Sequence, residues 1–364
     1  MRNSERTRSS SWLRRVVVTC FATLTAAGAW STAARAQQQA EGFGVERLYL
    51  SAPGAGWFVM DTLDMQGGLG GVAALTLGYA HDPLRIKSSD GSQHLAVVSD
   101  EAFANFGFAG TYDRWRLYLN FNMPLLIEGQ SGIVGHYQFG APAVDPGANP
   151  DTLSDARIGF EGRLLGDAAS PFRLGVDAQL FVPNGERADY VTDGSYRAMA
   201  RVLFAGDLGL FTYAGQLGVH VRPLDDSPTP GSPQGSELLF GVAGGAKLFA
   251  SKSRDTALIV GPEFFGATAF QSFLGPSGTA LESMLSARLE GTRDDEPQLR
   301  LKLGFGVGID PRFGAPEWRA AVAIELFDHH ADRDMDGIPN GHEACPDTPG
   351  IRTKDPRTSG CPHD

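Results

Sequence analysis

Residues 298–309 read QLRLKLGFGVGI and alternate strictly between two kinds of side chain. Every odd position is apolar, and every even position is polar or glycine. Successive side chains of a β-strand point to opposite faces, so this period of two predicts a strand with one apolar and one polar face. The stretch is also long enough for a tilted strand to cross the hydrocarbon core of a bilayer, which takes about 9–11 residues.

The same alternation recurs along most of the chain. Strands are expected near residues 69–80, 102–111, 114–124, 154–165, 171–182, 195–205, 209–222, 237–250, 255–268, 280–291, 297–309 and 317–327. Strands of a soluble β-sandwich are usually about five or six residues long, which is shorter than these. The connections alternate between tight turns and longer loops, as in outer-membrane barrels. The sequence therefore predicts an all-β protein, an antiparallel transmembrane barrel of about 12 strands over residues 68–327.

The N-terminal region has the composition of a secretory signal peptide. Five arginines precede an apolar run over residues 16–30, and Ala34-Arg35-Ala36 forms a small-x-small cleavage site. We interpret residues 1–36 as a signal peptide, with a membrane-anchoring helix as the alternative, and residues 37–67 as an N-terminal lead-in. No later window holds 18 uninterrupted apolar residues, so a mature protein in a membrane has to be a closed barrel.

The mature chain is acidic. Residues 1–36 carry six Arg and one Glu, so residues 37–364 hold 25 Lys+Arg against 41 Asp+Glu, a net charge of -16. This balance argues against nucleic acid as a partner and is compatible with calcium binding. Outer-membrane lipid is the expected partner of the barrel.

The polar face of the expected strands carries many charges. The candidates for a charged lumen are Arg114, Arg116, Arg157, Arg163, Arg173, Arg300, Lys302 and Arg319. Charges inside a barrel are tolerable in water or in pairs, which leaves two interpretations open. A water-filled pore would favour small anionic solutes. A narrow barrel would instead pair these side chains with acids and be closed.

The sharpest motif follows the last expected strand. Asp332-x-Asp334-x-Asp336-Gly337, five further residues and Glu343 fit the spacing of a twelve-position calcium loop. The Ile338 carbonyl at position 7 and Asn340 at position 9 complete the candidate ligands. The alternative is a solvated acidic linker. An EF-hand is not expected, because the preceding segment alternates as a strand and CPDTPG after the loop cannot form a helix.

Two resemblances follow from these residues. The loop with Cys345-Pro346 and the later Gly360-Cys361-Pro362 resembles a thrombospondin type 3 repeat, which implies a Ca²⁺ site on residues 332–343 within a tail over residues 328–364. The strand pattern, with Phe327 near its end, resembles outer-membrane β-barrel proteins. The layout is similar to OmpA-type proteins without their peptidoglycan-binding domain, so peptidoglycan anchoring is not expected.

Cys345 and Cys361 are the two cysteines that follow the signal peptide. Because the segment is exported, we expect a disulfide between them. The alternative is a zinc site that combines them with His329, His330, His342 or His363.

We expect a structural or porin-like outer-membrane protein with a periplasmic calcium-binding tail and no enzymatic activity. One alternative is a secreted calcium-dependent adhesion protein with a soluble β-sandwich. The other is an enzyme on the barrel wall, for which His220 is the candidate residue.

Overall fold

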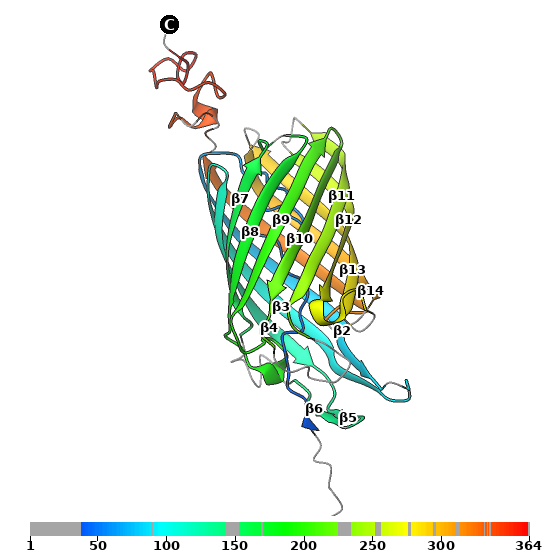
Figure 1. Ribbon diagram of the computed structural model, residues 1–364. Coiled ribbons are helices and arrows are strands. Elements are labelled where there is room, and N and C mark those ends of the chain that lie inside the picture. The colour runs from blue at the N-terminus through cyan, green and yellow to red at the C-terminus, as the bar shows by residue number, and fades with distance from the viewer. Residues whose placement is uncertain are drawn as a thin grey trace, which may run out of the picture. The chain divides into compact units, whose positions relative to one another are not determined.

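The computed structural model describes residues 38–88, 90–142, 144, 153–168, 170–224, 234–251, 256–275, 278–293, 296–310, 314–330, 332, 334 and 336–362. Residues 39–364 belong to one compact unit, drawn in Figure 1. The expected signal peptide, residues 1–36, and His363 lie outside the described residues.

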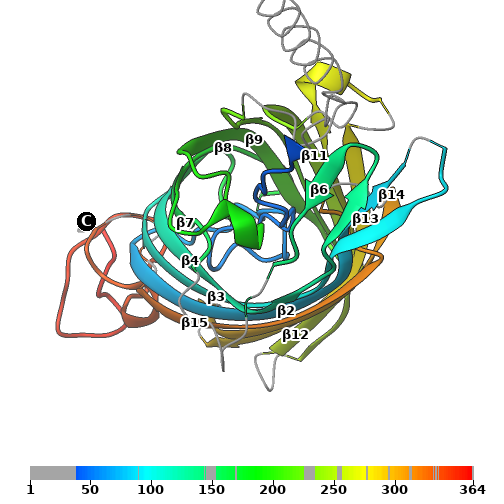
Figure 2. The ribbon, with the colours of Figure 1, turned by 90° about the horizontal axis from the view of Figure 1, so that it is seen from below.

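Twelve strands close into one antiparallel barrel (Figures 1 and 2). Each strand pairs with its neighbours in sequence, and the last pairs with the first. The strands are β2 (Leu69–Lys87), β3 (His94–Tyr112), β4 (Trp115–Glu128), β7 (Ala156–Leu165), β8 (Arg173–Val182), β9 (Arg197–Leu208), β10 (Phe211–Val221), β11 (Glu237–Ser251), β12 (Thr256–Ala269), β13 (Thr279–Arg293), β14 (Glu296–Asp310) and β15 (Trp318–His330). The predicted barrel is confirmed, and the soluble sandwich is wrong because one sheet closes on itself.

The register of β14 shows why the alternating stretch decides the fold. Leu303 pairs with Val322 of β15, and both are exposed on the outside of the barrel. Arg300 pairs with Glu325, and both are buried inside. Because the side-chain period of a strand is two, this register sends every leucine of the stretch outward and every charge inward.

The outer surface is apolar around the barrel. Large hydrophobic side chains such as Leu117 on β4, Phe160 on β7, Leu217 on β10 and Leu303 on β14 are exposed there. A closed sheet satisfies all of its backbone hydrogen bonds internally, which is what the interior of a bilayer demands. The chain is a transmembrane β-barrel. No helix of the described residues has both the length and the apolar character needed to cross a bilayer.

Tight turns gather at one end of the barrel and longer loops at the other. The loop end carries the hairpin of β5 (Gly132–Val134) and β6 (Tyr137–Phe139), with the 3-10 turns η2 (Arg187–Asp189) and η3 (Phe270–Ser272). A two-residue strand, β1 (Gln38–Gln39), precedes Ala40, whose N–H donates to the Gln138 carbonyl at 2.8 Å. The tail follows β15 and contains η4 (Asn340–His342).

Several strand ends differ from the sequence prediction, most of all those of β2 and β3. The expected loop over residues 81–101 is wrong, because β2 runs to Lys87 and β3 begins at His94. Register shifts between His81 and Arg85 interrupt the period of two there, so the pattern fades before the strands end. Likewise β15 continues past Phe327 to His330, and the Phe327 ring packs inward under the Arg300 guanidinium at 5.1 Å.

Residues 40–67, the luminal segment, run inside the barrel from the loop end to the turn end (Figure 2). At the loop end the Val45 N–H donates to the Tyr190 carbonyl at 2.9 Å. At the turn end the carbonyl of the next residue, Gly68, accepts from the Asp113 N–H at 2.9 Å. Between them Trp57 and Met60 are almost completely buried. Residues 40–67 of the predicted lead-in therefore occupy the lumen.

Candidate functional site: the charged lumen

The luminal segment packs its apolar residues against small residues of the barrel wall. Trp57, Phe58 and Met60 share a buried cluster with alanines of four strands, Ala205, Ala214, Ala243 and Ala323. A Cβ at Gly304 would come within 2.8 Å of the Phe58 ring, and one at Gly241 within 2.2 Å of Met60 Cε. Glycine on the polar face of the β14 stretch thus makes room for the segment.

Ion pairs join the wall to the acids of the luminal segment. Asp61 lies 3.3 Å from Arg201 Nη2 and 3.8 Å from Arg116 Nη1. Asp64 lies 3.5 Å from Arg300 Nη2. Glu46 lies 3.0 Å from Arg319 Nη1. Wall cations in the middle of the barrel are therefore neutralised by the segment as well as by wall carboxylates such as Glu161 and Glu325.

The wall also binds the backbone of the segment. The fully buried Glu263 carboxylate accepts from the N–H groups of Phe58 at 3.0 Å and Val59 at 2.9 Å. Arg163 donates to the Leu63 and Met65 carbonyls at 3.0 and 2.7 Å. Charged groups make the stronger hydrogen bonds, so these contacts fix the path of a segment that has no regular secondary structure of its own.

Seven of the eight predicted lumen residues are buried in the barrel, namely Arg116, Arg157, Arg163, Arg173, Arg300, Lys302 and Arg319. Arg114 is the exception. It lies in the turn between β3 and β4, outside both strands, pairs with Asp113 at 3.1 Å and leaves 51% of its side chain exposed. Its parity matched the inward face of β4, but that strand begins only at Trp115.

The acids of the lead-in and the acceptor Glu263 were not predicted as luminal residues from the sequence. Glu46, Asp61 and Asp64 sit among apolar residues of the lead-in, which is the signal that could have placed them in a charged lumen. Glu263 follows Pro262 within an apolar stretch, and nothing local marks it as a backbone acceptor.

A second network holds the segment at the loop end. Asp193, in the loop between β8 and β9, accepts from the Gly44 N–H at 2.8 Å and from Arg222 Nη2 at 2.6 Å. Burial raises the pKa of the Asp193 carboxyl, but Arg222, Arg197 and the Gly44 N–H outweigh it and hold that pKa well below its usual range. A carboxyl whose pKa is lower in the folded than in the unfolded protein stabilises the fold at pH values above its unfolded pKa. This stabilisation is lost as the pH falls towards the folded-state pKa. This contact therefore persists at neutral pH.

His220, the candidate for a barrel-wall enzyme, belongs to the same interior. It is fully buried, its Nδ1 lies 3.0 Å from Glu237 Oε1, and Tyr49 of the luminal segment packs edge-on against its ring. It thus lies against the luminal segment inside the barrel rather than on the outer rim.

The tail brings the three aspartates of the expected calcium loop together. Ligand oxygens of Asp332, Asp334 and Asp336 all lie within 4.8 Å of one another. Asp332 Oδ1 and Asp334 Oδ2 are buried and have no hydrogen-bond partner among the described residues. Burial raises the pKa of Asp334, as do the charges of the other two aspartates. Three converging carboxylates with buried, unused oxygens fit a hard cation.

The other expected ligands lie elsewhere in the same loop. Asn340 begins η4, and Glu343 packs beside Gly360, where a Cβ would come within 2.4 Å of Glu343 Oε2. Ile338 donates its N–H to Asp336 Oδ1 at 2.8 Å. Cys345 and Cys361 form a disulfide with a Cα–Cα distance of 5.0 Å, so the expected bridge is confirmed and the zinc alternative loses its thiolates.

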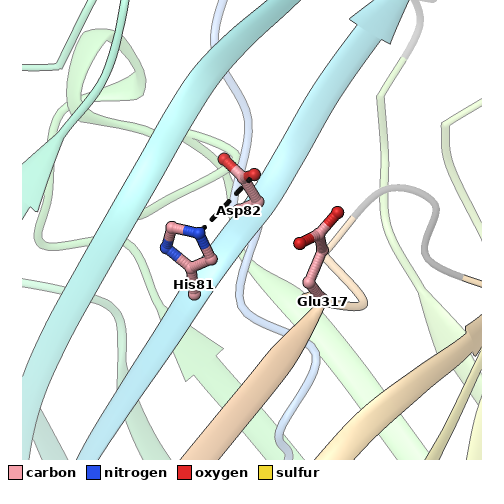
Figure 3. Close-up of side chains that lie close together, drawn as sticks. All are labelled: His81, Asp82 and Glu317. Atoms are coloured by element: carbon pink, nitrogen blue, oxygen red, sulfur yellow. Dashed lines mark ion pairs between the residues drawn. The ribbon is translucent and has the colours of Figure 1, made fainter.

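Figure 3 shows a second group of potential metal ligands that the sequence analysis missed. His81, Asp82 and Glu317 bring ligand atoms within 4.8 Å of one another at the loop end. Arg85 already pairs with Glu317, and His81 Nδ1 lies 3.2 Å from Asp100. These partners account for the charges of the group without a metal ion.

No protein-family model matches this sequence, and no curated protein matches it. Among solved structures, an outer membrane channel from Pseudomonas putida F1 is similar at 12% identity and a TM-score of 0.47, over 72% of this chain and 97% of that one. The NanC porin is similar at 6% identity and a TM-score of 0.43, over 70% and 98%. The β domain of the Bordetella autotransporter BrkA is similar at 14% identity and a TM-score of 0.36, over 71% and 98%.

Proposed function

We propose that this protein is a porin-like barrel of the bacterial outer membrane, closed at rest by its luminal segment and selective for small anions when open. The observation that carries the proposal is the crossing of the lumen by residues 40–67. Many of their contacts with the wall are ion pairs and hydrogen bonds to wall cations such as Arg201 and Arg300. Water can replace such contacts when the segment moves, and the exposed cations would then favour anionic solutes.

The orientation follows from the two ends. In outer-membrane barrels the short turns face the periplasm and the longer loops face outside. We propose the same orientation for this barrel, which places the tail after β15 in the periplasm and Ala40 of the luminal segment at the outer end.

Glu263 gives a direct test of closure. Glu263→Ala leaves the backbone N–H groups of Phe58 and Val59 buried without acceptors, which costs about 1–3 kcal/mol. At roughly tenfold for each 1.4 kcal/mol, the open fraction in planar-bilayer recordings is expected to rise about 5- to 150-fold.

The matched control for that recording is Glu317→Ala, which removes the same charge from the loop end, where Glu317 pairs with Arg85. It is expected to conduct as the wild type does. Both variants should be recorded only from protein with heat-modifiable mobility on gels, which reports a folded barrel. An equal open fraction in wild type and Glu263→Ala would contradict closure by the luminal segment.

We further propose that the tail binds Ca²⁺ as a thrombospondin type 3-like module. Support comes from the three converging aspartates and from the buried, unused oxygens of Asp332 and Asp334. In this proposal Asp332, Asp334 and Asp336 are the primary ligands. The Ile338 carbonyl, Asn340 and Glu343 supply further oxygens, and the disulfide holds the outgoing chain in place.

Calcium removal is expected to expose the tail to protease. A ligand at 100 times its Kd stabilises the bound state by about 2.7 kcal/mol, so cleavage within residues 336–362 should slow by roughly 100-fold in Ca²⁺ relative to chelator. The double variant Asp332→Ala, Asp336→Ala should be cleaved at the fast rate in both buffers, with the barrel intact. A variant that calcium still protects as fully as wild type would reject the site.

A further inference from the structure

A cavity of about 70 Å³ lies between the luminal segment and the barrel wall. One side is formed by residues 44–50 of the segment, and the other by polar side chains of β3, β4, β7 and β9. Gly44, Ser154 and Val191 of the loop end line it, so a solute would reach it from that side. One water needs about 10–15 Å³ by this measure of volume, so the space holds several waters or one small organic molecule.

The wall of this cavity contains a buried cation that forms no ion pair within the described part of the chain. Arg157 is 6% exposed and makes no ion pair with any described residue. Its Nη1 lies 3.4 Å from Gln179 Oε1, and its guanidinium stands 5.8 Å from the centre of the Tyr118 ring. An unpaired buried charge is costly, so a ligand that supplies the missing anion would offset that cost.

Two asparagines beside Arg157 add unused polar atoms. Asn120 is the register partner of Arg157, and its Nδ2 is buried without a hydrogen-bond partner. Asn122 lies two residues further along the same face of β4, and its Oδ1 is also buried without a hydrogen-bond partner. These are one donor and one acceptor about 6–7 Å apart along the strand. Asn120 Nδ2 and Arg157 can both donate to a carboxylate. Asn122 Oδ1 can accept from a hydroxyl or ammonium group on the carbon atom next to that carboxylate.

The remaining charges of the cavity limit its occupant to a single anionic group. Arg197 is already paired with Asp155 at 2.8 Å, and Glu46 is paired with Arg319 at 3.0 Å. Glu101, which also lines the cavity from β3, offers no positive charge to a second carboxylate. Tyr49 and Phe181, with ring centres 6.0 Å apart, offer an apolar surface for the carbon atoms.

We propose that this cavity is a binding site for a small monocarboxylate that carries a hydroxyl or amino group. The carboxylate binds Arg157 and Asn120 Nδ2, and the hydroxyl or ammonium group donates to Asn122 Oδ1. The site exists in the closed barrel, so its occupancy does not depend on conductance.

Saturation-transfer NMR on the full-length protein in detergent micelles tests the site, with lactate and its analogue without the hydroxyl, propionate, as probes. Lactate is expected to bind saturably, and propionate about tenfold more weakly because it leaves Asn122 Oδ1 unpaired. Arg157→Gln should weaken the binding of lactate by tenfold or more, since it removes the charge-assisted hydrogen bond to the carboxylate. Asn122→Leu should abolish the preference for lactate over propionate.

The matched control is Arg114→Gln, which removes an arginine from the exposed turn and should bind lactate as wild type does. All variants are compared as protein with heat-modifiable mobility. Absence of saturable lactate binding, or equal binding by wild type and Arg157→Gln, would overturn the site. Equal affinity of wild type for lactate and propionate would overturn the role of Asn122 and, with it, the hydroxy or amino specificity.

Discussion

Deletion of residues 40–66 is expected to turn the barrel into a steadily conducting pore. Barrels of 8 strands are just filled by their side chains, whereas those of 16–18 strands leave an aqueous channel. A barrel of 12 strands lies between these two sizes, so its side chains alone leave space in the lumen. The luminal segment fills that space, with Trp57, Phe58 and Met60 among its buried residues. If the wild type is open about 1% of the time, the time-averaged current should rise on the order of a hundredfold.

The deletion also predicts the sign of selectivity. It removes four acids, Glu41, Glu46, Asp61 and Asp64, and one cation, Arg47. Arg201, Arg300 and Arg319 then lose segment partners while remaining on the wall. Reversal potentials across a salt gradient should therefore show preference for anions. A deletion variant that folds and stays silent, or that prefers cations, would contradict the proposed pore.

Arg201→Met is expected to destabilise the folded barrel strongly. Arg201 Nε lies 2.9 Å from Asp177, and its Nη2 lies 3.3 Å from Asp61. Both carboxylates are completely buried. Removal of their shared cation takes away the ion pair of Asp177 and leaves Asp61 with the longer contact to Arg116 at 3.8 Å. Breaking a buried pair in this way costs about 3–5 kcal/mol, which urea-induced unfolding in detergent would measure.

The comparison variant is Arg114→Met, because Arg114 pairs with Asp113 at a largely exposed site and such pairs contribute about 0–1 kcal/mol. Adding Asp61→Asn to Arg201→Met should recover part of the loss, since one buried carboxylate is then neutral. Unfolding midpoints that coincide for the two single variants would show that the lumen is wet enough to screen Arg201.

Local pattern was enough to predict the wall of the barrel. In β14 and β15 the alternation alone assigns Leu303 to the lipid and Arg300 to the interior, because strand geometry fixes the side-chain period. The period of two did not predict the position of Arg114, which lies in the turn before β4. It also fails beyond His81, where register shifts break it. The aspartate spacing of the tail likewise predicted three carboxylates close together, because calcium loops use ligands at fixed offsets in sequence. Binding of Ca²⁺ there stays a prediction.

The occupant of the lumen was decided only by the tertiary structure. Asp61 and Arg201 are 140 residues apart, and Glu263 lies more than 200 residues from the N–H groups it binds. No local period encodes contacts of such separation, because they depend on how the closed sheet surrounds the segment. The sequence by itself determined a barrel with a charged inner face and an aspartate-rich tail. The tertiary structure decided that the inner face is filled, because the cations of the wall contact the acids of residues 40–67 only where the closed sheet surrounds that segment.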